Sequence, residues 1–416
     1  MGMWIIILIV TLAVGMAGLI YLATRFMRFF PTGKWGKHEK WLRPLLGIVA
    51  LSIVPVAAYL AFGVTNMIVI VIVLAFVWIL CDLVAHVARP ARQRASRGNK
   101  ASQVPQELRA QEKAQEPAAS QRVREPATAQ EKKKKPHVYV TGLVAIALTI
   151  LYLIGGYFQA HNTWEKDYRL GVDSSKQPLK IAMLADSHMG TTFHADRFAK
   201  ELKRIEATEP DLLVICGDMI DDDTSYEDML SSCEALGDFQ SEYGVFFCYG
   251  NHDRGYNALG RGYDGDAFAK ALTENGVHIL EDEVYKLDAD YTLIGRADAS
   301  VEQMGGQRKS MESLLEEVDP DSYTIVLDHQ PNDYEEEAKA GVGLVLSGHT
   351  HGGQMFPINR IGELIGANDS TYGYERHDRT DFIVTSGIGS WAIQFKTGCR
   401  SEFVVVKLTP ERGGAH

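Results

Sequence analysis

The chain contains 416 residues, of which 46% are hydrophobic and 23% are charged. Residues 1–158 contain 19 Lys and Arg against 7 Asp and Glu, whereas residues 159–416 contain 23 and 46. This asymmetry excludes one uniform soluble globule, and the length allows two or three domains. The acidic C-terminal part has no surplus of positive charge to bind phosphates nonspecifically, so no nucleic-acid partner is expected.

Four apolar runs occupy the basic part of the chain, at residues 4–23, 44–62, 67–87 and 138–158. Each has about the 20 residues that a helix needs to cross a bilayer. Buried helices of a soluble domain are the alternative, but four runs with almost no charge would be hard to house in such a core. The first run lacks the flanks of a cleaved signal peptide and is interpreted as a retained anchor. We therefore predict a multi-pass cell-membrane protein, with three transmembrane helices within residues 1–88 and a fourth at 138–158.

The loops between these runs predict the orientation. Basic residues gather between the first and second runs, and thirteen more lie in residues 89–137. The latter segment has almost nothing large and apolar to bury, and is predicted to be a disordered or loosely helical linker. Basic loops stay in the cytoplasm, which places residues 159–416 on the extracytoplasmic side. A different number of helices would reverse this topology and make the domain face the cytoplasm.

Two ionisable residues, Asp82 and His86, lie one helical turn apart near the end of the third run. An ionisable pair inside a membrane can form a proton or ion site. Because this pair lies at the predicted boundary of the bilayer, a polar helix end is the favoured interpretation.

Residues 159–416 are long enough for one large domain with its own core. Short apolar runs predict strands at residues 180–185, 211–216, 244–249, 323–327, 342–347 and 382–386. Residues 195–208 have apolar side chains at helical spacing. Strands that alternate with helices indicate an α/β fold. The five cysteines show no CxxC spacing, so neither a zinc knuckle nor a disulfide framework is predicted.

A polar motif directly follows each of five predicted strands. The motifs are DSH at 186–188, GDMID at 217–221, GNHD at 250–253, DHQP at 328–331 and GHTHGGQ at 348–354. Sites in open α/β sheets form outside the carboxyl ends of the strands, so these motifs are expected to converge. Singly, most of them are weak signals, since a lone Asp-x-His or Gly-Asp is common by chance. Five in order, each at a strand end, favour one functional site.

The residue types in these motifs indicate metal chemistry. The candidate metal ligands are Asp186, His188, Asp218, Asn251, His329, His349 and His351. Aspartate and histidine together suit divalent cations such as manganese, iron(II) or zinc. Two such cations can clamp the attacking and leaving oxygens of a displacement at phosphorus and can acidify a bound water. His252 then remains to donate a proton to the leaving oxygen, and Asp221 to orient a neighbouring histidine.

The ordered series resembles the calcineurin-like metallophosphoesterase superfamily, whose motifs are D-x-H, G-D-x-x-D, G-N-H-[DE], H and G-H-x-H. The resemblance covers roughly residues 178–408, and the GHTHGGQ ending is similar to a membrane-associated bacterial subgroup. It implies a four-layer α/β/β/α sandwich with a binuclear metal centre. One metal would be bound by Asp186, His188, Asp218 and His351, and the other by Asp218, Asn251, His329 and His349. His252 would be the catalytic acid, supported by Asp221 and Asp253.

These observations predict a membrane-anchored phosphoesterase that uses a metal-activated hydroxide on phosphodiester or pyrophosphate bonds, including those of lipid-linked or envelope substrates. Its expected partners are this phosphate-ester substrate and the lipid bilayer. Protein Ser/Thr phosphatases of the superfamily carry Asp-Arg-Gly where this chain has residues 221–223, DDD, so a protein phosphatase is not expected. The alternatives are a non-catalytic membrane sensor or scaffold with a structural metal site, and a cytoplasm-facing enzyme acting on a lipid precursor or nucleotide.

Two further features stay open. The Gly/Tyr/Arg-rich residues 254–263 directly follow the GNHD motif. They can form a lid or a grip on a headgroup, or simply a surface loop. The histidines outside all motifs are interpreted as structural or surface residues; they are His161, His194, His278 and His377.

Overall fold

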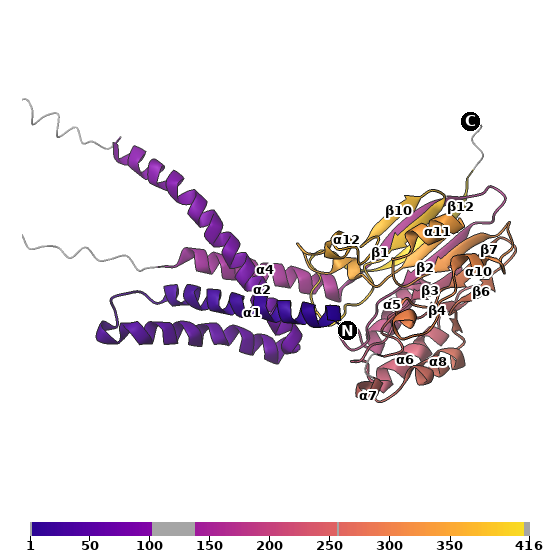
Figure 1. Ribbon diagram of the computed structural model, residues 1–416, viewed down its shortest axis with the longest axis horizontal. Helices are drawn as coiled ribbons and strands as arrows, with labels where there is room; N and C mark the ends of the chain where they lie inside the picture. The colour runs from indigo at the N-terminus through magenta and orange to yellow at the C-terminus, as the bar shows by residue number, and fades with distance from the viewer. Residues whose placement is uncertain (1, 102–137, 256–257, 412–416) are drawn as a thin grey trace, which may run out of the picture. The chain divides into compact units, whose positions relative to one another are not determined.

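The computed structural model describes residues 2–101, 138–255 and 258–411 (Figure 1). The chain divides into two compact units, Met1–Leu151 and Tyr152–His416. The boundary between them falls inside one helix, α4, which extends from Val140 to His161. The C-terminal part of this apolar helix therefore belongs to the same compact unit as the α/β domain.

The first unit is helical. Its elements are α1 (Gly2–Phe26), the short 3-10 turns η1 (Met27–Phe29) and η2 (Gly36–His38), α2 (Glu39–Ala101) and the beginning of α4. Three segments of the described chain are long and apolar enough to cross a membrane: Ile9–Phe29, Gly36–Ala88 and Val140–His161. Membrane-spanning helices are thus supported by length and composition, whereas the number of crossings stays a prediction.

The helix α2 contains a break between the second and third predicted runs. Gly63 has φ 79° and ψ −179°, a backbone conformation outside the helical region that glycine adopts without a steric penalty. Figure 1 shows the two parts of α2 leaving this point in different directions. The helix continues to Ala101, so the first residues of the predicted linker are helical. Residues 102–137, the rest of that linker, lie outside the described residues.

An aromatic and charged contact holds α1 against α2. The fully buried Trp78 has the ring of Phe26 at 5.3 Å between centroids. Asp82 pairs with Arg25 at 2.6 Å, and it accepts a hydrogen bond of 2.9 Å from the hydroxyl of Tyr21. Asp82 therefore contributes to the contact between two helices. The sequence had favoured its interpretation as a polar helix end.

The second unit contains two six-stranded sheets, with strand orders β1-β12-β2-β3-β4-β5 and β10-β11-β9-β8-β7-β6. The strands of the first sheet are β1 (Thr163–Val172), β2 (Leu179–Leu184), β3 (Leu212–Cys216), β4 (Val245–Cys248), β5 (His278–Ile279) and β12 (Ser401–Pro410). The strands of the second are β6 (Glu283–Lys286), β7 (Tyr291–Gly295), β8 (Tyr323–Leu327), β9 (Leu344–Ser347), β10 (Gly373–His377) and β11 (Thr380–Val384). Strands β2 to β5 are parallel to one another, as are β7, β8, β9 and β11, which brings their carboxyl ends to one edge of each sheet.

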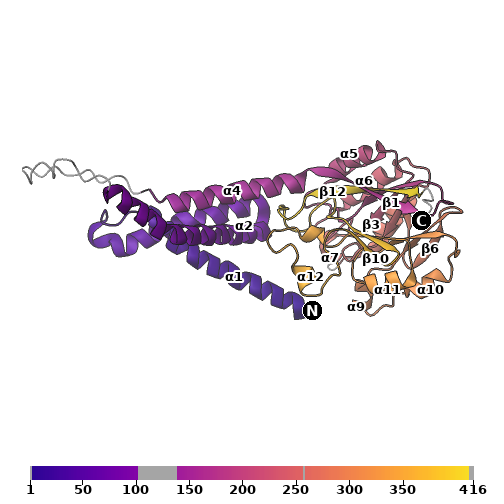
Figure 2. The same ribbon diagram turned by 90° about the horizontal axis from the view of Figure 1, so that it is seen from above.

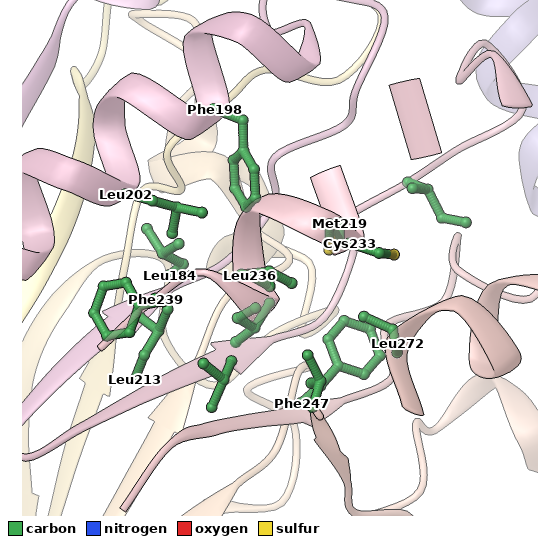
Figure 3. Packing of buried hydrophobic residues seen from close by; sticks show 14 of the residues in the cluster. Leu184, Phe198, Leu202, Leu213, Met219, Cys233, Leu236, Phe239, Phe247 and Leu272 are labelled. Carbon is green, nitrogen blue, oxygen red and sulfur yellow. The ribbon is translucent and has the colours of Figure 1, made fainter. Parts of the chain in front are cut away.

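Helices connect and cover these strands. They are α5 (Ala195–Glu206), α6 (Tyr226–Gly237), α7 (Ala258–Arg261), α8 (Gly265–Glu274), α9 (Ser300–Gln303), α10 (Met311–Leu315), α11 (Tyr334–Ala340), η3 (His351–Gly353) and α12 (Ile361–Leu364). One buried cluster joins α5, α6 and α8 to the first sheet (Figure 3). A second lies between the two sheets, and a third joins α10 and α11 to the second sheet. This succession agrees with the expected α/β/β/α order.

The α/β fold class is confirmed, and all six predicted strands are present, as β2, β3, β4, β8, β9 and β11. The helix predicted at 195–208 is α5. The sequence did not identify β1 and β12, which pair with each other in parallel over ten residues. All five cysteines are free, in agreement with the absence of a predicted disulfide framework.

Replacing Phe198 tests the contact between α5 and the first sheet. This side chain is fully buried and points from α5 into the cluster that includes Leu184 and Leu213 (Figure 3). We expect Phe198→Ala to lower the free energy of unfolding by about 3–5 kcal/mol, because it removes apolar contacts and leaves a cavity. Urea unfolding of the detergent-solubilised chain measures the change. Lys200→Ala, on the exposed face of the same helix, is the control; equal stability of the two variants would contradict this packing.

Candidate metal centre

The loops that follow five strands meet at the edge shared by the two sheets, and hydrogen bonds join them directly. Within the first sheet, the amide of Asp186 donates to the carbonyl of Gly217 at 3.0 Å. Within the second, the amide of Gly348 donates to the carbonyl of His329 at 3.0 Å. The amide of His349 donates to both carboxylate oxygens of Asp186, at 2.9 and 3.0 Å, and so connects the two sheets. The strand-end motifs therefore form one site.

The side chains of these loops form two groups of candidate metal ligands. Asp186, His188 and His351 make one group, and Asp218, His329 and His349 make the other. Within each group, the ligand atoms lie within 4.8 Å of one another. These are six of the seven residues predicted to bind metal, and they fall into the two sets that the family resemblance implied.

The remaining predicted ligand, Asn251, lies against the second group. Its Oδ1 accepts a hydrogen bond of 2.8 Å from Nδ1 of His349 and lies 3.2 Å from Nε2 of His329. Asp218 lies between the two groups, with its Oδ2 3.1 Å from Nε2 of His329 and 3.7 Å from Nε2 of His188. This position suits a carboxylate that bridges two ions.

The backbone at the predicted ligands has an uncommon conformation. Positive φ angles occur at Asp186 (56°), His188 (41°), Asp218 (53°), His349 (68°) and His351 (50°). Residues with a Cβ rarely adopt this region, and each such residue stores strain that the surrounding structure must hold in place. These residues sit on sharp turns directly after strands, and the turns direct their side chains into the same volume.

Second hydrogen bonds fix the orientation of two histidines. Nδ1 of His329 donates to the carbonyl of Cys216 at 2.8 Å, which directs Nε2 toward Asp218. Nδ1 of His188 lies 3.1 Å from Oδ2 of Asp221. Asp221 therefore orients a neighbouring histidine, as expected from the sequence. Such outer partners set which nitrogen faces a metal.

Two observations suit the candidate ligands to divalent ions: their residue types, and buried side-chain nitrogens that lack a hydrogen-bond partner among the described residues. Nε2 of His188 and Nδ1 of His351 are buried and have no hydrogen-bond partner among the described residues. An unpaired buried polar atom is costly, and coordination of a cation would satisfy the imidazole nitrogen of His188 that faces Asp218. Imidazole and carboxylate ligands together suit manganese, iron or zinc.

Burial and neighbouring charges set the protonation of the site. Burial raises the pKa of Asp186 to about 6. Burial also acts to raise the pKa of Asp218, but the charge and hydrogen bond of His329 outweigh it and hold that pKa well below its usual range. Burial lowers the pKa of His349 to about 4 and lowers the pKa of His351 as well. Asp218 is therefore ionised and the last two histidines are neutral, the forms in which these residues bind metals.

Two predicted catalytic residues, His252 and Asp253, lie next to the ligand groups. The amide of His252 donates to Oδ1 of Asp218 at 2.8 Å, and its ring centroid lies 5.2 Å from that of His188. Asp253 is fully buried and accepts hydrogen bonds from the amides of Asp218 and Gly250, at 2.8 and 2.7 Å. Asp253 thus supports the loops, whereas the ring of His252 faces the site.

Three residues near the site have contacts that the sequence did not predict. Trp391 has its ring centroid 5.2 Å from that of His252. The buried Lys396 donates from Nζ to the carbonyl of Ser386, at 2.6 Å. Arg261 is buried and donates to the carbonyl of Asp253 at 2.9 Å. The GIGS sequence at 387–390, directly after a predicted strand, was the available signal for a sixth loop at the site.

The open questions about residues 254–263 are answered in part. Arg261 is a structural support rather than an exposed grip, and Arg254 lies over the ring of Tyr249 at 4.2 Å. Residues 256–257 lie outside the described residues. None of the four histidines outside the motifs belongs to either ligand group formed by the described residues.

Comparisons with known proteins show what this chain is similar to. Residues 179–353 match the family model of calcineurin-like phosphoesterases. An uncharacterized metallophosphoesterase of Campylobacter jejuni is 29% identical over 269 residues, which cover 64% of this chain and 69% of the relative. A Bos taurus protein, named transmembrane protein with metallophosphoesterase domain, is 30% identical over 250 residues, which cover 56% of this chain and 54% of the relative. A dimetal phosphatase from Danio rerio superposes with a TM-score of 0.31 at 12% identity, over 50% of this chain and 86% of that one.

A domain of two mixed sheets whose strand ends gather two groups of candidate metal ligands is a metallophosphoesterase fold. Residues 179–353 match the family model of calcineurin-like phosphoesterases, so the domain that they form is similar to this family. This match supports both the family resemblance and the enzyme class inferred from the motifs, a hydrolase of phosphoric esters. The subgroup suggested by the GHTHGGQ ending stays a prediction, because the matched relatives do not define it.

Removing the shared carboxylate tests the arrangement of the ligands. Asp218→Asn takes a negative charge from between the two groups, so we expect the purified chain to lose at least one of two bound divalent ions. Elemental analysis after dialysis against a metal buffer measures the content. Asp223→Asn, which changes an exposed carboxylate in the same loop, should keep the content of the parent. Equal metal content in both variants would exclude Asp218 as a ligand.

Proposed function

We propose that this chain is a membrane-anchored, metal-dependent phosphoesterase that hydrolyses phosphodiester or pyrophosphate bonds at a centre of two divalent ions. The observation that carries the proposal is the position of Asp218 between two groups of ligands, with the ring of His252 beside them. Two adjacent cations suit a displacement at phosphorus, because they neutralise the attacking and leaving oxygens together. The family match to calcineurin-like phosphoesterases supports this chemistry.

The residues of the chain have separate tasks in this mechanism. Bound divalent ions would supply Lewis acidity, which lowers the pKa of a coordinated water and stabilises charge on the phosphoryl oxygens. His252 is positioned by its backbone hydrogen bond to Asp218 and by the ring of Trp391. Burial lowers the pKa of His252, which makes its protonated form a stronger acid toward the leaving oxygen. Asp221 holds the tautomer of His188 through Nδ1.

The substrate we favour is a phosphoester held in or at a membrane. The motive is the continuity between α4, which is apolar enough to span a bilayer, and the catalytic domain, which begins its first strand directly after that helix. A diester or pyrophosphate of a lipid-linked or envelope molecule would reach a site held near the bilayer surface. A nucleotide or lipid precursor is the corresponding substrate if the domain faces the cytoplasm.

Turnover tests the proposed reaction. The full-length chain in detergent should hydrolyse a nitrophenyl phosphodiester with added manganese, and His252→Ala should lower kcat by about 10²–10⁴ while it keeps the metal content of the parent. His349→Ala should lose both turnover and metal, since it removes a ligand. Release of nitrophenolate and elemental analysis are the two measurements.

The same assay separates an enzyme from a non-catalytic sensor or scaffold. A scaffold that keeps metals only for stability would show no turnover in the parent, and His252→Ala would then change nothing. A panel of monoesters, diesters, pyrophosphates and phospholipids, tested on the parent, identifies the substrate class. A monoester as the sole substrate would overturn the proposed bond type.

Protease accessibility tests the topology. We propose an extracytoplasmic catalytic domain, so a protease site inserted after Gly305, in an exposed loop, should be cut when protease is added to intact cells. A site inserted in residues 102–137, the basic linker, should be protected until the cells are permeabilised, because basic loops stay in the cytoplasm. The reverse pattern would favour the cytoplasm-facing alternative.

A further inference from the structure

An apolar loop of the catalytic domain, residues 356–365, exposes its largest side chains. It begins directly after the GHTHGGQ motif and its following Met, and includes the short helix α12. Phe356 is 60% exposed, Leu364 84% and Ile365 64%, and Ile358 and Ile361 are also more than half exposed. Contiguous exposed apolar side chains mark a surface that contacts a partner or a membrane.

This apolar loop is attached to the C-terminal part of α4. The hydroxyl of Tyr152 donates to the carbonyl of Phe356 at 2.5 Å and lies 2.5 Å from the hydroxyl of Thr397. The amide of Lys396 donates to the carbonyl of Gly156 at 2.9 Å. A Cβ at Gly156 would come within 2.5 Å of Thr397, so the two backbones approach closely there. Figures 1 and 2 show α12 on the side of the domain where α4 joins it.

The attachment point sets the depth of the loop. The helix α4 has 22 residues, a length of about 33 Å, which matches a hydrocarbon core of about 30 Å. Tyr152 precedes His161, the last residue of α4, by nine positions, which is about 14 Å along the helix axis. When α4 spans a bilayer, the carbonyl of Phe356 therefore lies below the level of the helix end, at the depth of the acyl chains in that leaflet.

The charged residues within the loop are compatible with this depth. Arg360 lies 3.7 Å from Glu363 in an ion pair, and the exposed Arg360 has a long stem that can carry its charge toward the headgroups. Glu363 also accepts a hydrogen bond of 2.8 Å from the amide of Thr371. The exposed side chains of Leu364 and Ile365 are apolar, so their contact with water is unfavourable.

We propose that residues 356–365 are immersed in the lipid leaflet that surrounds the C-terminal part of α4. The partner of this surface is the bilayer itself, at the depth of the acyl chains. Continuity with a helix of membrane-spanning length distinguishes this occupant from a second copy of the chain or another protein.

The immersed loop is also directly connected to the candidate metal centre. Gln354 lies between the ligand His351 and Phe356 in the chain, and its side chain donates to the carbonyl of Ile393 at 2.7 Å. The segment that contains Ile393 also carries Trp391, whose ring lies beside His252. If the proposed phosphoesterase activity holds, the site therefore lies close to the membrane surface and accepts an amphiphilic phosphoester whose apolar part stays in the leaflet.

Depth-dependent quenching tests the immersion. The full chain carries Cys81→Ala and Cys399→Ser, which remove the two partly exposed cysteines, together with Leu364→Cys labelled with bimane. It is reconstituted in phosphatidylcholine nanodiscs that contain doxyl-labelled acyl chains. We expect strong quenching at position 364, comparable with that of a label at the exposed Ile154 on α4. A label at the exposed Lys286 on β6 should stay at the background level.

Two outcomes would overturn the proposal. Quenching at position 364 no stronger than at position 286 would place the loop in water. The label could instead be protected from aqueous iodide only at high protein concentration and remain unquenched by the doxyl-labelled lipids. This result would assign the surface to a second copy of the chain. Neither measurement depends on catalysis, so the immersion is tested even if the chain hydrolyses no phosphoester.

A charge placed on the loop tests the consequence for the substrate. The double variant Leu364→Glu, Ile365→Glu changes two exposed side chains, so it should fold and should cleave the soluble nitrophenyl diester at the rate of the parent. Its kcat/KM on a phosphoester embedded in the nanodisc should fall at least about tenfold, since carboxylates are excluded from hydrocarbon. Equal losses on both substrates, or no loss on either, would contradict a role of the loop in reaching a membrane substrate.

Discussion

The candidate metal centre depends on one buried carboxylate, that of Asp253. Its two oxygens accept hydrogen bonds from four backbone amides, those of Asp218, Met219, Ile220 and Gly250, at 2.7 to 3.2 Å. These amides belong to the loops after β3 and β4, so a single side chain fixes the loop that carries the candidate ligand Asp218 against the loop that carries Asn251. Burial opposes the charge and raises the pKa of Asp253 to about 7, whereas the amides favour the ionised form. Because the four amides come from two loops, the relative position of these loops depends on this one carboxylate.

The strained backbone at the candidate ligands also depends on the structure around it. Positive φ angles at five ligand positions cost of order 1–3 kcal/mol each when the surrounding structure does not hold them. The sheets provide that support, because buried strands precede these turns. The amides at four of the five positions also donate hydrogen bonds to groups on neighbouring loops; these are Asp186, His188, Asp218 and His349. The ligand groups are therefore organised by the protein before any ion binds. A preorganised site loses little entropy on binding a cation or a phosphoryl group.

The sequence predicted those parts of the fold and site that local chemistry determines. The strands from β2 to β4 and β8, β9 and β11 were evident as apolar runs, and the motifs after them named the residues that the structure gathers. The pairing of β1 with β12 was not predictable, because it joins segments more than 200 residues apart and β1 contains consecutive charged residues, EKD at 165–167, instead of an apolar run. The positions of Trp391 and Lys396 beside the site, and the supporting contact of Arg261, were not predictable for a similar reason. Each supports the site through a contact that no local pattern shows.

The helix α4 belongs to the same compact unit as the α/β domain from Tyr152 onward, so the domain does not begin at its first strand. Only Asn162 separates the end of α4 from the start of β1, and β1 pairs along its whole length with β12. The segment from Trp391 to Cys399 then contacts the helix on one side, at Gly156, and the site on the other. Because Cys399 donates to the carbonyl of His351, the position of this helix is connected to a candidate ligand through fixed contacts rather than through a flexible tether. These contacts make the C-terminal part of α4 a packed element of the unit that contains the candidate metal centre, and they join the helix to the site through neighbouring loops of that unit.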